Sequence, residues 1–327
     1  MTGMKLLEKL TQINSPSGNE GSIREFIINE IKDLCDEINV DALGNIIARK
    51  KGNGSKVMFA AHMDEIGITA SFIDDNGFIR FGAVGGLEIK ALINRRVMFQ
   101  NGVLGVIGCE DEVEKPDIKK LYIDIGAKNK KDAEKSVSIG DTAMFTGEFY
   151  KRGDIVVSKA LDNRVGCYAL IEAMRNIKSY KNDLYFVFTV QEEVGLRGAK
   201  TSAFSINPDF AVAVDVTDTG DMPNAPTMAV KLGGGAAVKV MDRSVMCNID
   251  VREHIIATAK ENKIPYQLEI MTDGGTDAGA IHLSGAGVKT GGVSIPTRYI
   301  HSPSEMASIS DIKACVELIT ALAQKQW

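Results

Sequence analysis

The chain has 327 residues, of which 44% are hydrophobic and 25% charged, the balance of a globular protein with a sizeable core. Lysine and arginine number 38 against 43 aspartates and glutamates, which gives a formal net charge of −5. This slight acidity provides no basic surface for nucleic acid or for an anionic membrane, so we expect neither as a partner.

Five cysteines lie far apart in the sequence and form no C-x-x-C pair. Their odd number and wide spacing argue against a disulfide framework and against a cysteine-rich zinc site. The N-terminal residues lack the long apolar segment of a signal peptide, and no run approaches the 18 apolar residues of a membrane span. We therefore expect a cytoplasmic location.

The first 66 residues have an α/β pattern. Apolar residues recur every three or four positions over residues 4 to about 35, which predicts helical structure, and Ser17 or Asn19 can cap its start. The apolar run 57–61 then ends at His62. A run without polar alternation is typical of a strand that is covered on both faces of a parallel sheet.

Residues 67–158 differ from their surroundings. Short apolar runs at 77–81, 96–99 and 121–125 are interrupted by glycine and Asn/Asp turns, and helical periodicity is nearly absent. This pattern predicts a small β-barrel or sandwich inserted into the α/β part.

The α/β alternation returns after residue 159. A helix is expected from Asp162 to about residue 177, strands at 184–190, 210–214 and 266–270, a helix near 248–262, and a C-terminal helix from Ser310. The predicted fold is α/β. A mixed, mostly parallel sheet flanked by helices (1–66 and 159–327) is interrupted by a small, PDZ-like β-barrel (67–158).

Histidines and acids follow the apolar strand runs. Because the carboxyl ends of strands border the ligand crevice of an open α/β sheet, these scattered residues can converge on one site. Imidazoles and carboxylates together suit borderline divalent ions such as zinc, cobalt or manganese. The residues concerned are His62 with Asp64, Asp162, Glu192 with Glu193, Asp215 and His301.

Two of these pairs have a local geometry that can be predicted. If the chain stays extended at Glu192 and Glu193, the two side chains point in opposite directions, which fits one ligand and one general base. Residues His62 and Asp64 share a face of a strand, so Asp64 can accept the second ring N–H of His62 and fix its tautomer.

Four short motifs give a more specific indication. In chain order they are Ala61–Gly67 (AHMDEIG), Ala160–Arg164 (ALDNR), Gln191–Gly195 (QEEVG) and Tyr299–Ser302 (YIHS). Together they resemble the M42 family of metallo-aminopeptidases, which includes glutamyl and tetrahedral aminopeptidases, and the resemblance runs from end to end. The predicted β insertion of this chain corresponds to the dimerisation domain of that family.

The resemblance implies a dinuclear metal-dependent aminopeptidase that acts on short peptides with a free N-terminus. It implies two divalent ions, zinc or cobalt with manganese as a further possibility, bridged by Asp162. The other ligands would be His62 and Asp215 for one ion, and Glu193 and His301 for the other. Glu192 would be the general base, with Asp64 as the second catalytic assignment. Assembly into dimers and a dodecamer is also implied.

Alternatives remain open at this point. A metal-independent glycoside hydrolase needs only two carboxylates, and some members of this family are labelled endoglucanases; a related amidohydrolase or deacylase and a non-enzymatic scaffold are further options. Surface or packing roles are expected for His254 and His282. Arg298 can meet a substrate carboxylate or pair with an acid, and Gly233–Gly235 suggests close packing or a substrate-facing loop. Thr276 and Asp277 receive no chemical role.

Overall fold

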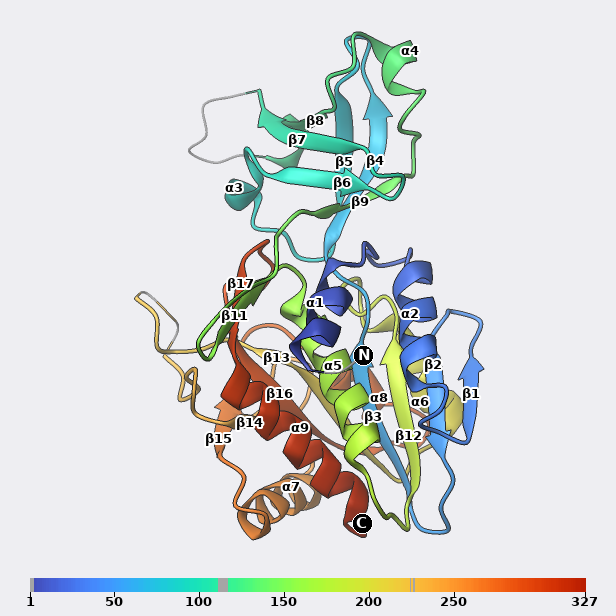
Figure 1. Cartoon of the computed structure of the whole chain (residues 1–327), viewed down its shortest axis with the longest axis vertical. Coiled ribbons are helices and arrows are strands. Elements are labelled where there is room, and N and C mark those ends of the chain that lie inside the picture. The colour runs from blue at the N-terminus through green and yellow to red at the C-terminus, as the bar shows by residue number, and fades with distance from the viewer. Residues whose placement is uncertain (1–2, 111–116, 224, 226) are drawn as a thin grey trace.

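The computed structural model describes residues 3–110, 117–223, 225 and 227–327. Figure 1 shows a larger α/β part, which holds both ends of the chain, and a smaller β part beyond it. Among the described residues, none of the helices combines the length and the apolar character that a membrane crossing requires.

One mixed sheet organises the larger part. Its described strands follow the order β1-β2-β12-β3-β13-β16-β17-β11-β10, and β14 and β15 continue from β16. The centre, β12-β3-β13-β16, is parallel, whereas both margins are antiparallel. The strands are β1 (Glu37–Val40), β2 (Ile46–Lys50), β3 (Lys56–His62), β10 (Tyr150–Arg152), β11 (Ile155–Ser158), β12 (Asp183–Thr189), β13 (Phe210–Thr217), β14 (Ala236–Met241), β15 (Tyr266–Ile270), β16 (Lys289–Arg298) and β17 (Glu305–Ser308).

Helices cover both faces of this sheet, as predicted from the apolar run in β3. Val57 and Phe59 belong to the core shared with α1, α2, α5, α7 and α9, whereas Met58 and Ala60 pack with α6 and α8 on the opposite face. The helices are α1 (Met4–Gln12), α2 (Gly21–Ile31), α5 (Leu161–Asn176), α6 (Arg197–Ile206), α7 (Ile249–Glu261), α8 (Ala278–Ile281) and α9 (Ile309–Gln324).

The N-terminal helical region is divided into α1 and α2, and its predicted cap is wrong. Glu20 is the N-cap of α2 and makes no side-chain capping bond. Ser17 instead donates its hydroxyl to Asp64, at 2.6 Å. The segment between the helices follows the turn after β3, where Pro16 pairs with Glu65. Tertiary contacts with the site therefore determine the conformation that sequence periodicity assigned to a helix.

The smaller part is a closed antiparallel barrel in the order β4-β5-β8-β7-β6-β9. It confirms the predicted β-barrel, and its interior is apolar, with Ile68, Val97, Phe99 and Ile123 buried. Its strands are β4 (Gly67–Ile73), β5 (Ile79–Val84), β6 (Arg96–Phe99), β7 (Leu104–Cys109), β8 (Leu121–Asp124) and β9 (Thr142–Phe145), with short helices α3 (Ile89–Leu92) and α4 (Lys130–Ala133) and the 3₁₀ turn Ile118–Lys120.

The segment after the barrel returns to the large sheet before residue 159. Strands β10 and β11 pair with each other, and β11 pairs with β17. Residues 150–158 therefore belong to the large sheet by their hydrogen bonding, although the predicted insertion included them. The division of the chain into domains at 66/67 and 158/159 stays a prediction.

Candidate metal centre

The predicted site residues converge at the carboxyl ends of the central strands. His62 is the last residue of β3, and Asp215 lies within β13, two residues before its end, rather than after the strand as predicted. Their side chains line a cavity of about 510 Å³. The same cavity is lined by Asp162, Glu192, Glu193 and His301.

A first group of potential ligands surrounds His62. Its Nε2 atom lies 3.1 Å from Oδ1 of Asp162 and 3.6 Å from Oδ1 of Asp215. One ligand atom from each of the three residues lies within 4.8 Å of the others, and all three side chains are buried. Such a pocket of one imidazole and two carboxylates offers the donor types that zinc-like ions bind.

A second group surrounds His301, in the turn after β16. Its Nε2 atom lies 3.4 Å from Oδ2 of Asp162 and 3.1 Å from Oε2 of Glu193. These three residues also satisfy the 4.8 Å spacing. The segment that follows barrel strand β5 lies against His301. A Cβ atom added to Gly86 of this segment would lie 3.0 Å from Nδ1 of His301.

Asp162 belongs to both groups, and its two carboxylate oxygens face different histidines. It lies in the first turn of α5 with non-helical backbone angles, and the N-cap position is taken by Ala160 with a positive φ of 52°. Asp162 is therefore not the N-cap of α5. Its pKa is lowered, because the two imidazoles outweigh the effect of burial.

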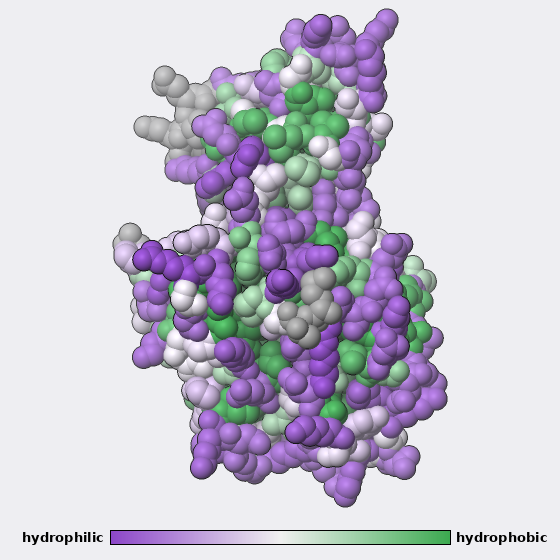
Figure 2. Space-filling model, viewed as in Figure 1, coloured by the Kyte–Doolittle hydropathy of each residue, from purple (hydrophilic) through white to green (hydrophobic). Residues whose placement is uncertain are grey.

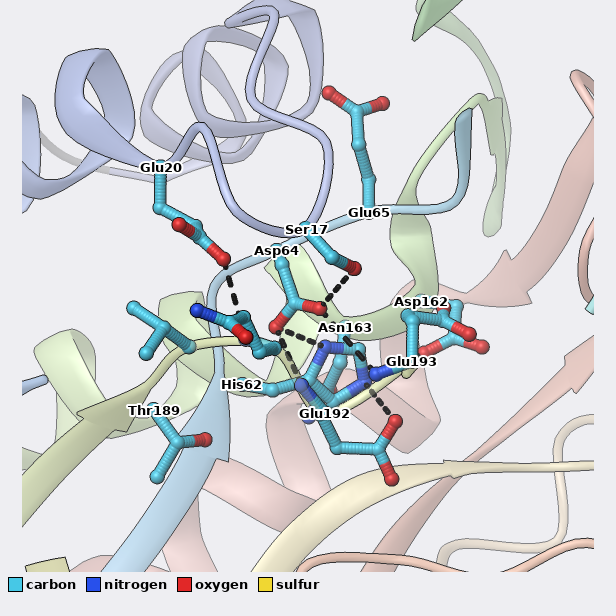
Figure 3. A network of polar contacts seen from close by, with 12 residues as sticks. Ser17, Glu20, His62, Asp64, Glu65, Asp162, Asn163, Thr189, Glu192 and Glu193 are labelled. Atoms are coloured by element: carbon cyan, nitrogen blue, oxygen red, sulfur yellow. Dashed lines mark hydrogen bonds and ion pairs between the residues drawn. The ribbon is translucent and has the colours of Figure 1, made fainter. Parts of the chain in front are cut away.

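Behind His62 lies Asp64, which is fully buried (Figure 3). Its Oδ1 atom is 3.5 Å from Nδ1 of His62, the side on which its contact was predicted. Its carboxylate also accepts hydrogen bonds from the backbone N–H groups of Glu192 (3.1 Å) and Glu193 (3.3 Å) and from the Ser17 hydroxyl. Burial opposes ionisation of Asp64, but these partners and His62 outweigh it and lower its pKa.

The extended conformation, on which the predicted opposite orientation of Glu192 and Glu193 depended, is absent at this pair. Strand β12 ends at Thr189, and Gln191 adopts a positive φ of 54°, so the chain is no longer extended at the pair. Both side chains line the cavity, with Oε2 of Glu192 at 3.9 Å from Nε2 of His62. Burial raises the pKa of Glu192 well above its ordinary value, and the carboxylates of Asp215 and Glu193 raise it further against the effect of His62.

Sequence reasoning missed Glu305, the first residue of β17. Its carboxylate accepts hydrogen bonds from the backbone N–H groups of Asp162 (2.8 Å) and His301 (3.0 Å). It thus joins two of the three segments that carry the second group, those of Asp162 and His301. A carboxylate four residues after His301 has no recognisable spacing signal, because its partners are backbone groups from distant segments.

The remaining candidates lie outside the cavity or act in packing. His254 stacks on Trp327, with ring centroids 4.3 Å apart, and His282 bonds to the carbonyl of Ala278 at 2.9 Å. Arg298 pairs with Asp221 at 2.7 Å, which decides between its two predicted roles.

The two loops that the sequence left without a clear role are both held by hydrogen bonds to side chains. The N–H groups of Gly233 and Gly235 each donate to Asp311 at 2.7 Å, so this glycine loop packs against the start of α9. In the other loop Thr276 donates its hydroxyl to Asp242 (3.1 Å), and Asp277 accepts a hydrogen bond from Thr189 (2.5 Å).

The electrostatics of the site favour a cation. Burial and the carboxylate of Asp162 raise the pKa values of Glu193 and Asp215, against the opposite effect of the neighbouring histidines. Burial opposes protonation of His301, but Asp162 and Glu193 outweigh it and raise the pKa of His301 to about 12. Oε1 of Glu193 is buried without a hydrogen-bond partner. The donor set therefore fits divalent metal ions, which would satisfy these atoms and offset the negative charge.

Known proteins resemble this chain along most of its length. The model of a family described as M42 glutamyl aminopeptidase matches residues 44–318. A protein of Acetivibrio thermocellus that carries an aminopeptidase name is 56% identical over 317 residues, 96% of each chain.

Solved structures are equally similar. An aminopeptidase of the archaeon Desulfurococcus kamchatkensis superposes with a TM-score of 0.94 at 38% identity, over 98% of this chain and 94% of that one. The TET1 peptidase of Pyrococcus horikoshii, which can assemble into a tetrahedron or a large octahedral shell, superposes with a TM-score of 0.89 at 38% identity, over 98% of this chain and 99% of that one. The chain belongs to the M42 glutamyl aminopeptidase family and is a hydrolase that acts on peptide bonds.

Proposed function

We propose that this protein is a dinuclear metal-dependent aminopeptidase that removes N-terminal residues from short peptides. The observation that carries the proposal is the position of Asp162, whose two oxygens face two separate groups of potential ligands. One shared carboxylate between two such groups is the arrangement expected of a two-metal site.

The residues would divide into two sets. His62, Asp215 and one oxygen of Asp162 would hold one ion, and Glu193, His301 and the other oxygen would hold the second. Zinc, cobalt and manganese all suit this donor set. Bound there, two such ions would supply Lewis-acid chemistry, which polarises the scissile carbonyl and acidifies water.

Glu192 would act as the general base. It lines the cavity beside His62 but belongs to neither ligand group. Its raised pKa suits a group that takes a proton from the attacking water and returns it to the leaving amine. Asp64, which holds the backbone of Glu192, would keep this carboxylate in place.

A panel of aminoacyl reporters tests the proposal. The purified protein is assayed with free-amino and N-acetylated versions of each reporter, with zinc, cobalt or manganese and after complete chelation. Hydrolysis of free-amino reporters alone, lost on chelation and restored by metal, is expected. Preference for the N-acetylated reporters would instead indicate a deacylase, and polysaccharide hydrolysis that survives chelation would indicate a glycosidase.

Self-association is part of the proposal. The TET1 relative assembles into shells, and we expect dimers and a dodecamer for this chain as well. Hydrophobic side chains gather on the barrel in the face shown by Figure 2, and exposed apolar residues of the barrel strands include Phe72, Leu104 and Val106. Light scattering of the purified protein measures the assembly size directly, and a monomer at micromolar concentration would contradict this part.

A further inference from the structure

The catalytic cavity adjoins a second cavity of about 620 Å³ that the reaction centre does not use. Asp218, Met271 and Asp273 line both cavities. The second cavity is otherwise walled mainly by apolar side chains, among them Met228, Val240, Leu268 and Ile270. A substrate residue held at the reaction centre can therefore extend along an apolar wall that begins at two carboxylates.

Neither carboxylate in the shared wall forms an ion pair with a lysine or an arginine among the described residues, although His301 lies near enough to Asp218 to lower its pKa against the effect of burial. Asp218 follows β13, is only partly exposed, and forms neither an ion pair nor a hydrogen bond with the described residues. Asp273, in the loop before α8, is exposed, and it also forms no ion pair with any of the described residues. Both differ in this from Asp221, three residues after Asp218, which is paired with Arg298.

Outside the candidate metal centre, the charged groups that line the two cavities among the described residues are all carboxylates. Neither cavity is lined by a lysine or an arginine among the described residues, and the only imidazoles, His62 and His301, belong to the candidate metal centre. An acidic side chain in the second cavity would meet the carboxylates of Asp218 and Asp273 and, among the described residues, no lysine, arginine or histidine in its wall. A side chain with a long aliphatic part and a cationic end would match both the apolar wall and the acids.

We propose, resting on the aminopeptidase function above, that the enzyme prefers substrates with N-terminal lysine or arginine, whose cationic end is bound by Asp218 and Asp273. The aliphatic part of the substrate side chain packs on Met271 and the neighbouring apolar wall. Substrates with N-terminal glutamate are disfavoured, although the family is described as glutamyl aminopeptidase.

The test compares kcat/KM for lysyl, arginyl, leucyl and glutamyl reporters that share one leaving group, using the metal-loaded protein. The kcat/KM values for the lysyl and arginyl reporters are expected to exceed the value for the glutamyl reporter by about 100-fold. The cationic side chains gain a charged hydrogen bond to the carboxylates, whereas the glutamyl side chain is repelled by them. Asp218→Asn is expected to lower kcat/KM for the lysyl reporter about 10- to 100-fold more than for the leucyl reporter. Asp273→Asn should act in the same direction, with a smaller effect because this residue is more exposed.

Asp250→Asn is the matched control, because it removes an exposed carboxylate on α7 outside both cavities. A binding measurement that needs no turnover accompanies the assay: L-lysine is expected to raise the melting temperature more than L-norleucine or L-glutamate, and Asp218→Asn to abolish this difference. A glutamyl preference, or an equal loss on all reporters in Asp218→Asn, would overturn the inference. Absence of hydrolysis on every free-amino reporter would refute the proposed function instead, and the melting temperatures would then decide the inference alone.

Discussion

Oδ1 of Asp64 accepts a hydrogen bond from the backbone N–H of Glu192, at 3.1 Å. The same oxygen lies 3.5 Å from Nδ1 of His62. One buried carboxylate thus connects the end of β3, which carries a candidate metal ligand, to the loop after β12, which carries the candidate base. This side chain and the pairing of β3 with β12 at His62 and Thr189 together hold the ligand and the base in their relative position (Figure 3).

Asp64→Asn should weaken both functions of this connection. The asparagine amide offers one accepting oxygen, where the carboxylate offers two, to the Ser17 hydroxyl and two backbone N–H groups, and it removes the negative charge 3.5 Å from Nδ1 of His62. We therefore expect metal affinity and kcat to fall about 10- to 100-fold. Titration calorimetry and steady-state kinetics measure the two effects. Ser17→Ala removes only one of the hydrogen bonds and should change either quantity by no more than about 10-fold. Wild-type affinity and kcat in Asp64→Asn would contradict the assigned role.

Glu192→Gln should separate catalysis from metal binding. The amide keeps the size of the side chain but cannot take a proton, so kcat should fall by about 10² to 10⁴. Metal content, measured by elemental analysis, should stay near the wild-type value because Glu192 belongs to neither ligand group. Near-wild-type turnover in this variant would show that another group is the base.

Glu305→Gln should disturb the second ligand group, although Glu305 bonds only to backbone N–H groups of that group and not to its side chains. The carboxylate accepts from two backbone N–H groups, and a glutamine would present an N–H donor to one of them. We expect a loss of about 1 to 3 kcal/mol in the free energy of unfolding and weaker metal binding. Urea denaturation and metal titration measure these changes. Glu317→Gln, an exposed position on α9, is the control and should leave both unchanged.

Metal removal should destabilise the fold. Buried acids of the site repel one another, and bound ions stabilise the folded chain by about 4 kcal/mol when the free metal concentration is a thousand times Kd. Chelation should therefore lower the urea midpoint and the melting temperature, and added zinc should restore both. An unchanged unfolding curve in excess chelator would show that the site does not hold metal at equilibrium.

Much of the architecture could be predicted from local patterns. The apolar run in β3 indicates a strand covered on both faces because its side chains meet helices on either side. After residue 67, short apolar runs alternate with glycine and Asn/Asp turns and show no helical periodicity. This pattern indicates the barrel because short strands joined by tight turns need such residues. Strand ends also indicate where polar residues converge, because parallel strands share one carboxyl edge.

The features that could not be predicted from the sequence have a common physical cause. Each depends on contacts between residues that lie far apart in the chain. Glu192 and Glu193 point into the same cavity because Asp64 binds both backbone N–H groups after the strand has ended. Ser17 does not cap a helix because the same carboxylate takes its hydroxyl. Glu305 acts through backbone groups of remote segments, and no spacing in the sequence records that.

The shared position of Asp162 is tested most directly by anomalous diffraction from crystals grown with zinc. We predict two zinc peaks per chain, one beside His62 and Asp215 and the other beside Glu193 and His301, with Asp162 next to both. A single peak, or peaks away from Asp162, would contradict the two-metal account.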